Sequence, residues 1–256
     1  MNLRTWINRP KEPRGAQRDG RELTELEIEN TLAPLDPRVR DALLSMYRGE
    51  PQLGMDGERH ALKPDTRVSP SEGMWLYELC LSVRPRATTE IGMAYGYSAL
   101  YFLAAHAKCG SGHHTAIDPC EAHLWHGIGL AQVRACFGDI PDAFQFIDDR
   151  SDRVATDLAR SGRTFDIVFI DGPHLFEHAL ADFHLYAPLC TIGGHVVLDD
   201  VWMPSIRTLS DFLRANRPDF LHVPAREGNI SVFQRVAEDS RSWGHFRQFP
   251  VQGDMD

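Results

Sequence analysis

Three acidic residues follow two strongly apolar segments in the second half of the chain. Asp171 closes the segment 165–171, and Asp199 and Asp200 stand at the end of the segment 195–199. Both segments are typical of buried strands, and neighbouring parallel strands bring their carboxyl ends to one edge of a sheet. Clustered carboxylates raise one another's pKa unless a cation is present. One strand-end aspartate would equally suit a turn, but three favour a hard ion such as Mg²⁺, Mn²⁺ or Ca²⁺.

A turn with two glycines follows an earlier strand-like segment. It reads Glu90-Ile-Gly-Met-Ala-Tyr-Gly-Tyr-Ser98. Gly92 and Gly96 would let the backbone approach a ligand closely, and Ser98 opens a helix whose free amides favour an anionic group. Asp118 ends the next strand, where it could accept hydrogen bonds from ribose hydroxyls. These residues predict a nucleoside-type cofactor site; the alternative is a tight strand-to-helix turn without a ligand.

His174 is the histidine best placed to do chemistry, because it lies three residues after Asp171. A neutral imidazole of ordinary pKa, about 6.5, could accept a proton there; a helix-start histidine without a catalytic role is the alternative. The stretch from His174 to His178 also matches the inverted zinc-protease motif H-x-x-E-H. The Asp171-Gly-Pro sequence just before it and the glycine turn argue against a protease. His113 and His114 are expected to precede a strand and to be solvated.

Apolar strand patterns alternate with helical patterns from residue 69 onward. We expect strands at 88–92, 115–118, 144–147, 165–171 and 195–199, and helices starting at 69 and spanning 98–107, 121–137, 151–159 and 174–186. One more helix and two extended runs, 220–223 and 230–235, follow. This order predicts an α/β fold: a doubly wound, Rossmann-like, mainly parallel sheet with helices on both faces and a C-terminal antiparallel hairpin.

The first part of the chain lacks the alternating strand and helix patterns. Residues 1–30 are polar, and 37–48 has the apolar spacing of a short helix. We therefore expect residues 1–66 to form an arm and helical extension, acting as a lid or a dimer contact, and residues 67–256 to form the main domain.

Composition narrows the classes of function. The 256 residues include 36 acidic and 27 basic side chains, a formal charge of −9, which argues against nucleic acid as a partner. No apolar run is long enough to span a bilayer, and the start of the chain lacks a signal-peptide core. Five scattered cysteines suit a reducing compartment. We expect a cytoplasmic protein with no membrane partner.

The segment Glu90-Ile-Gly92…Gly96-Tyr97-Ser98-Ala99 resembles the class I S-adenosylmethionine-dependent methyltransferases, and most of all the metal-dependent small-molecule O-methyltransferases such as catechol O-methyltransferase. The resemblance covers residues 67–236. It implies that the glycine turn holds the methionine moiety, that Asp118 binds ribose and that Ser151 lies near the adenine. The implied cofactor-binding residues are Glu90, Gly92, Ala94, Tyr95, Gly96, Tyr97, Ser98, Asp118, Pro119, Ser151 and Asp171.

The resemblance also implies roles for the acidic residues. Asp171 and Asp199 match metal ligands of the family; the residue matching Asp200 is often asparagine, and is aspartate in sugar-modifying relatives. His174 stands where the relatives carry a lysine, the presumed general base. The metal candidates are thus Asp171, Asp199 and Asp200, and the catalytic candidates are His174 and Asp171.

These expectations describe one activity. The chain would be an S-adenosylmethionine-dependent, divalent-metal-dependent O-methyltransferase of a small hydroxylated molecule, either a sugar or natural-product hydroxyl or a catechol-like diol. A homodimer is expected. Two alternatives are a nicotinamide-dependent Rossmann reductase, disfavoured by the glycine spacing, and a non-catalytic cofactor-binding module, disfavoured by the acidic set.

Overall fold

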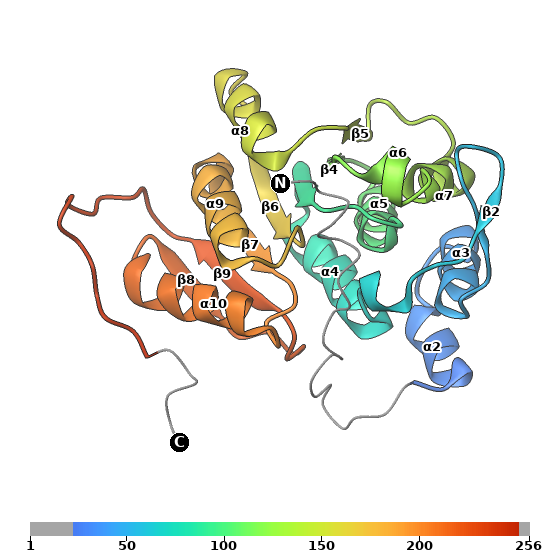
Figure 1. The fold of residues 1–256 in the computed structure, drawn as a ribbon, viewed down its shortest axis with the longest axis horizontal. Coiled ribbons are helices and arrows are strands. Elements are labelled where there is room, and N and C mark those ends of the chain that lie inside the picture. Colours follow the sequence, from blue (N-terminus) through green and yellow to red (C-terminus); the bar gives the residue numbers. More distant parts are fainter. Residues whose placement is uncertain (1–22, 251–256) are drawn as a thin grey trace.

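The computed structural model describes residues 23–250 of the chain. Its centre is a seven-stranded sheet with the strand order β5-β4-β3-β6-β7-β9-β8 (Figure 1). The first five strands in this order are parallel, and the last two pairings are antiparallel. The strands are β3 (Ala87–Ile91), β4 (His113–Ile117), β5 (Phe144–Ile147), β6 (Phe165–Ile170), β7 (Cys190–Leu198), β8 (Phe220–Val223) and β9 (Ser231–Arg235). The predicted doubly wound fold with a C-terminal hairpin is confirmed.

Helices cover both faces of the sheet, so each face has its own apolar core. In β6, Ile167 and Phe169 belong to one core, whereas Val168 and Ile170 belong to the other, because side chains alternate between the faces of a strand. A strand buried on both faces is apolar throughout, which explains the continuous pattern of this segment. The surrounding helices are α4 (Pro70–Val83), α5 (Tyr97–Cys109), α8 (Ser151–Arg160), α9 (Phe176–Tyr186) and α10 (Pro204–Asn216), with short 3₁₀ turns at Pro64–Thr66 and Ala187–Leu189.

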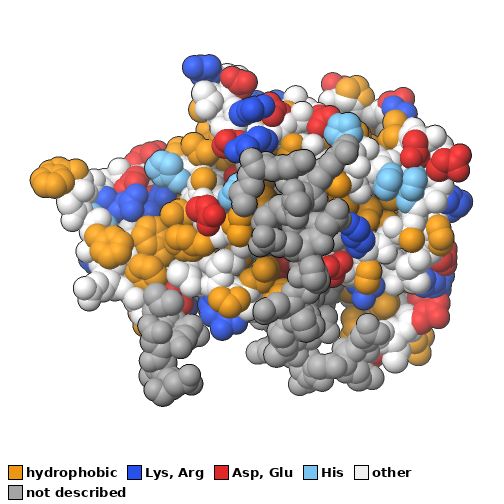
Figure 2. All heavy atoms as spheres, in the orientation of Figure 1, with side chains coloured by type: hydrophobic (Ala, Val, Ile, Leu, Met, Phe, Trp, Pro, Cys, Tyr) orange, Lys and Arg blue, Asp and Glu red, His pale blue; other side chains and the backbone are white. Residues whose placement is uncertain are grey.

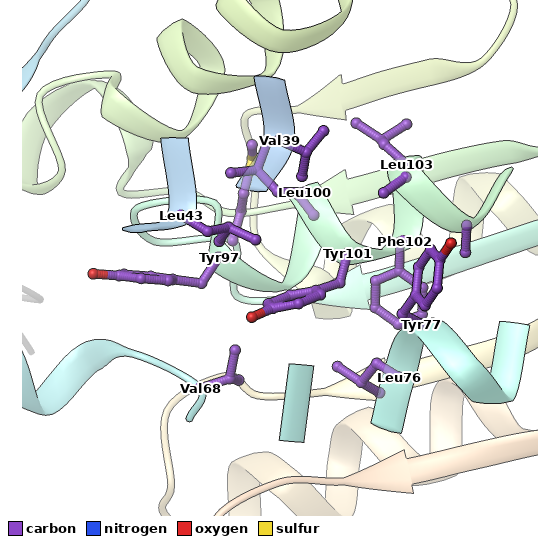
Figure 3. Close-up of a cluster of buried hydrophobic side chains, with 14 of the residues drawn as sticks. Val39, Leu43, Val68, Leu76, Tyr77, Tyr97, Leu100, Tyr101, Phe102 and Leu103 are labelled. Atoms are coloured by element: carbon purple, nitrogen blue, oxygen red, sulfur yellow. The ribbon is translucent and has the colours of Figure 1, made fainter. Parts of the chain in front are cut away.

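Two helices precede the sheet, α2 (Glu25–Leu32) and α3 (Pro37–Tyr47). Figure 3 shows Val39 and Leu43 of α3 in one apolar cluster with Leu100 of α5. Helix α3 therefore shares the core of the sheet domain. The helix expected at 37–48 is present, whereas residues 1–22 of the expected arm lie outside the described residues.

The helix expected at 121–137 is divided into α6 (Glu121–Leu124) and α7 (Ile128–Phe137). Between them His126 has φ 57° and Gly127 has φ 67°, a left-handed conformation that interrupts a right-handed helix. Beside this break lies a small hairpin of β1 (Gln52–Leu53) and β2 (Arg59–His60).

Two expectations about histidines need correction. Both His113 and His114 belong to β4, and His114 is fully buried rather than solvated. The Thr88 hydroxyl lies 2.8 Å from its Nδ1, so a partner on the neighbouring strand offsets the cost of burying the ring. Helix α9 begins at Phe176, so His174 precedes the helix instead of starting it. Among residues 23–250, no helix has the length and apolarity that crossing a membrane requires.

Candidate active site

The glycine turn leaves the sheet at the end of β3, between β4 on one side and β6 on the other. Strand order reverses at this point, which is where open α/β sheets bind ligands. Asp118, after β4, holds the turn: its Oδ2 accepts hydrogen bonds from the backbone amides of Met93 (3.1 Å) and Ala94 (2.9 Å), and its Oδ1 accepts one from Cys120 (2.7 Å). Burial raises the pKa of Asp118, and these amides oppose the rise. Asp118 thus shapes the turn itself.

The two glycines of the turn are required by the protein's own backbone. Gly92 has φ 91° and Gly96 has φ 82°. A Cβ on Gly92 would lie 2.2 Å from the carbonyl oxygen of Asp171, and one on Gly96 would lie 2.8 Å from Cα of Gly129. Each glycine therefore allows close packing against another segment of the chain, and the expectation that the two glycines also make room for a ligand stays a prediction.

The polar side chains around the turn already have partners within the protein. Ser98 Oγ donates to Glu90 Oε2 at 2.5 Å, and both residues are buried. The Tyr97 hydroxyl donates to the carbonyl of Met46 in α3 at 2.9 Å, so this side chain fastens α3 to α5. The structure therefore pairs Ser98 with Glu90, whereas the Tyr97 hydroxyl is engaged by α3.

The side chain of Tyr95 contacts Lys63 and Trp125. Its hydroxyl accepts a 3.4 Å hydrogen bond from the backbone amide of Lys63, and its ring packs edge-on against Trp125 with centroids 5.2 Å apart. The Lys63 ammonium lies 5.7 Å from the centre of the same Trp125 ring. The turn is thereby connected to the segment after the hairpin β1–β2.

Pro119 follows β4, which lies beside β3, and Ser151 follows β5, the next strand beyond β4. Ser151 begins α8, and its hydroxyl donates to Asp182 Oδ1 of α9 at 2.6 Å. Burial raises the pKa of Asp182 to about 6. Pro119 is half-buried directly after Asp118. The Ser151 hydroxyl thus already has a hydrogen-bond acceptor in α9.

The acidic residues after β6 and β7 come together with His174. Its Nε2 atom lies 3.1 Å from Asp171 Oδ1 and 3.2 Å from Asp200 Oδ2. Candidate ligand atoms of these three residues all lie within 4.8 Å of one another. The imidazole therefore stands between two carboxylates at the edge where the sequence predicted a cation.

Asp199 is buried beside this group. Burial is the main cause that raises the pKa of its carboxyl, and the nearby negative charge of Asp171 adds to the rise. Asn229 Nδ2 lies 3.4 Å from Asp199 Oδ1 and 3.2 Å from Asp200 Oδ1. Trp202 Nε1 donates to Asp200 Oδ1 at 2.9 Å. The carboxylates are thus packed closely enough for their charges to oppose one another.

Asn229 is not among the residues that the sequence pattern indicates. This residue lies in the loop between β8 and β9 and reaches the acidic group because β9 pairs with β7 in the antiparallel direction. Its only local signal is the Gly228-Asn229 turn, which says nothing about its distant partners.

The acidic group and the glycine turn are joined through the backbone. The Asp171 amide donates to the carbonyl of Ile91 at 2.9 Å, and the Asp199 amide donates to that of Ile170 at 3.1 Å. A ligand held by the turn would therefore lie beside the carboxylates.

The H-x-x-E-H stretch is not assembled as in a zinc protease. His174 lies before α9, whereas His178 is within it. Among residues 23–250, the metal-capable group that contains His174 does not include His178.

The chain has a doubly wound sheet with a glycine turn at its switch point, and residues 89–201 match the family model described as a methyltransferase domain. The protein is a methyltransferase, as the sequence predicted. No curated protein matches the chain significantly.

Several solved structures share the fold at low sequence identity. A methyltransferase of Podospora anserina bound to SAH is 13% identical with a TM-score of 0.62, covering 85% of this chain and 98% of that one. An O-methyltransferase from Bacillus cereus, also with SAH, is 17% identical with a TM-score of 0.59 and covers 82% and 96%. The O-methyltransferase TomG from Streptomyces achromogenes, involved in tomaymycin synthesis and bound to SAM, is 19% identical with a TM-score of 0.58 and covers 79% and 91%.

Proposed function

We propose that the protein transfers the methyl group of S-adenosylmethionine to a hydroxyl oxygen of a small molecule. The observation that carries this proposal is the close packing of Gly92 against the backbone of Asp171, beside the hydrogen bond from the Asp171 amide to Ile91, the residue before the glycine turn. A methyl donor held by the turn would then lie next to an acceptor held by the carboxylates. The similar structures with SAH or SAM, two of them described as O-methyltransferases, support the same activity.

The cofactor would lie across the carboxyl ends of β3 and β4. Helix α5 begins at Tyr97 immediately after the turn, and the positive end of its dipole favours the carboxylate of the methionine moiety. Asp118 would face the ribose while it holds the turn. Ser151 and Pro119 would border the adenine.

Asp171, Asp199 and Asp200 would hold a hard divalent ion, with Mg²⁺ preferred over Mn²⁺ or Ca²⁺. Asp171 and Asp200 have ligand atoms within 4.8 Å of one another. The pKa of Asp199, which lies beside them, is raised by burial and by negative neighbours that a cation would offset. When bound, the ion would supply a contact for two adjacent acceptor oxygens and lower the pKa of one of them.

His174 would accept the proton of the acceptor hydroxyl. Its Nε2 faces Asp171 and Asp200, and ionised carboxylates only accept hydrogen bonds, so Nδ1 of the neutral imidazole would be the atom that takes the proton. The acceptor would be a sugar or natural-product hydroxyl, or a catechol-like diol. An aliphatic hydroxyl is less acidic than a catechol and therefore needs such a base more.

Calorimetry and turnover assays test this proposal. We expect the protein to bind S-adenosylmethionine and not NAD(P)H, and to methylate members of a panel of vicinal diols and catechols. EDTA should stop methyl transfer without preventing cofactor binding, and added Mg²⁺ should restore it. Undiminished turnover in exhaustively chelated protein would refute the metal role, and absence of cofactor binding would refute the activity itself.

We further propose that the chain is a cytoplasmic homodimer in which the N-terminal extension, residues 1–66, contributes to the dimer contact or to a lid. The free cysteines suit a reducing compartment. Exposed apolar side chains at Leu23 and Leu26 are available to a second copy. A monomer in light scattering would contradict the dimer.

A further inference from the structure

A second group of potential metal ligands lies apart from the acidic group. Asp56 lies in the turn of the hairpin β1–β2, His60 ends β2, and His126 lies at the break between α6 and α7. Candidate ligand atoms of the three residues lie within 4.8 Å of one another. His60 Nε2 is 2.8 Å from Asp56 Oδ2, and His126 Nδ1 is 4.0 Å from the same oxygen. Figure 2 shows histidine and acidic side chains grouped on the side where Figure 1 places β2 and α7.

The backbone is arranged to bring the hairpin against His126. The amide of Met55 donates to the carbonyl of His126 at 2.9 Å. A Cβ on Gly54 would lie 2.6 Å from that carbonyl, and one on Gly127 would lie 2.6 Å from Cβ of Met55. Glycines at both positions are therefore what allows this approach.

His126 itself has an unfavourable backbone conformation. Its φ of 57° is rare for a residue with a side chain. Such strain persists where the surroundings enforce it, and it is concentrated at functional positions. The strained conformation sets the His126 ring over that of His60, with centroids 3.8 Å apart and the planes 5° from parallel.

The chemistry of the group suits a transition-metal ion. Two imidazoles and one carboxylate are ligands that Zn²⁺ accepts, with water in the remaining position. The Glu58 amide donates to Asp56 Oδ1 at 3.0 Å and so helps to hold this carboxylate in place. Parallel rings cannot both point at one ion, so one ring must rotate on binding. The His126 side chain is 43% exposed and has the freedom to do so.

We propose that Asp56, His60 and His126 bind a Zn²⁺-type ion that ties the hairpin β1–β2 to the start of α7. Trp125, which packs on Tyr95 of the glycine turn, immediately precedes His126. The ion would therefore stabilise the segment that covers this turn. This role is structural and does not depend on the identity of the acceptor or on the acidic group.

Metal titration of the full chain tests the site. Zn²⁺ binding is measured by calorimetry, and Co²⁺ binding by its visible absorption, both with excess Mg²⁺ present to occupy the acidic group. We compare the wild type with His60→Gln and His126→Asn; asparagine tolerates the left-handed backbone at position 126. His123→Gln, an exposed histidine of the neighbouring helix α6, is the matched control.

The wild type and the control should bind one equivalent of Zn²⁺ and show a higher midpoint of thermal unfolding with the ion. Each ligand variant should raise the Kd by more than about tenfold, a loss of about 1.4 kcal/mol, and lose the thermal shift. Thermal unfolding without metal shows whether the variants fold. Absence of Zn²⁺ binding by the wild type, or equal Kd values in folded ligand variants, would overturn the proposal.

Discussion

His174 is held in place by groups from three segments of the chain. Its Nε2 faces Asp171 and Asp200, and its backbone carbonyl accepts a 2.6 Å hydrogen bond from the Ser205 hydroxyl at the start of α10. The side chain is 11% exposed, so it has little freedom to turn. A base fixed in this manner does not lose conformational entropy when the acceptor arrives.

Replacing this imidazole should reduce catalysis without affecting cofactor binding. We expect His174→Ala to lower kcat by about 10²–10⁴-fold, the usual contribution of a general base, with the Kd for S-adenosylmethionine unchanged. His178→Ala, which removes the second histidine of the same stretch, should retain turnover. Near-normal kcat in His174→Ala would remove the residue from the mechanism.

At the scale of elements, the glycine turn is a junction between three segments. It joins β3 to α5, packs against Asp171 after β6 through Gly92, and packs against α7 through Gly96. The helix α5 that it starts has a second left-handed glycine at its other end, Gly110 (φ 75°), around which a Cβ would meet no atom within 4 Å. A side chain at Gly110 would therefore meet only the unfavourable left-handed backbone, whereas one at Gly96 would also meet a neighbouring segment.

This contrast predicts a difference in stability between two alanine variants. Gly110→Ala should cost about 1–2 kcal/mol from the left-handed backbone alone. Gly96→Ala should cost clearly more, because the new Cβ also meets Gly129, and it should weaken cofactor binding. Urea unfolding of both variants measures the difference. Equal losses would mean that the close approach to α7 contributes nothing.

At the scale of the whole molecule, the buried acid Glu121 makes the stability of the fold depend on pH. Glu121 is fully buried below the glycine turn, where its Oε1 accepts a 3.0 Å hydrogen bond from the Leu130 amide. Burial raises the pKa of Glu121 to about 8, and the charge of Asp118 contributes to the rise. Between about pH 4.5 and 8 the folded protein therefore keeps a proton that the unfolded chain releases. The contribution of Glu121 to the free energy of unfolding is therefore fully present below about pH 4.5 and is lost as the pH rises towards 8.

Glu121→Gln should remove this pH dependence. Apart from a constant offset, the variant should gain stability relative to the wild type as the pH rises from 5 to 9, by up to a few kcal/mol. Urea unfolding across this range provides the measurement. Glu78→Gln, on the exposed side of α4, should follow the wild type, and parallel curves for Glu121→Gln and the wild type would contradict the shifted pKa.

Periodic apolar patterns were sufficient to predict the sheet, because strands buried on both faces and amphipathic helices leave strong local signals. Contacts between distant segments leave none. The partner of Tyr97 is a carbonyl in α3, Asn229 reaches the carboxylates only through the pairing of β9 with β7, and His114 is buried because Thr88 lies on the next strand. The candidate residues were thus predictable as a set, whereas the partners of each residue required the fold.

The left-handed backbone at Asp200 (φ 57°) implies a trade between stability and activity. Asparagine adopts this conformation more readily and carries no charge beside Asp199, so Asp200→Asn should raise the thermal midpoint of the metal-free protein. The same change should reduce the additional stability gained from Mg²⁺. An equal gain in both proteins would argue against this view. A protein that keeps the aspartate has retained the less stable choice at this position, which is the pattern expected where selection acts on turnover more strongly than on folding.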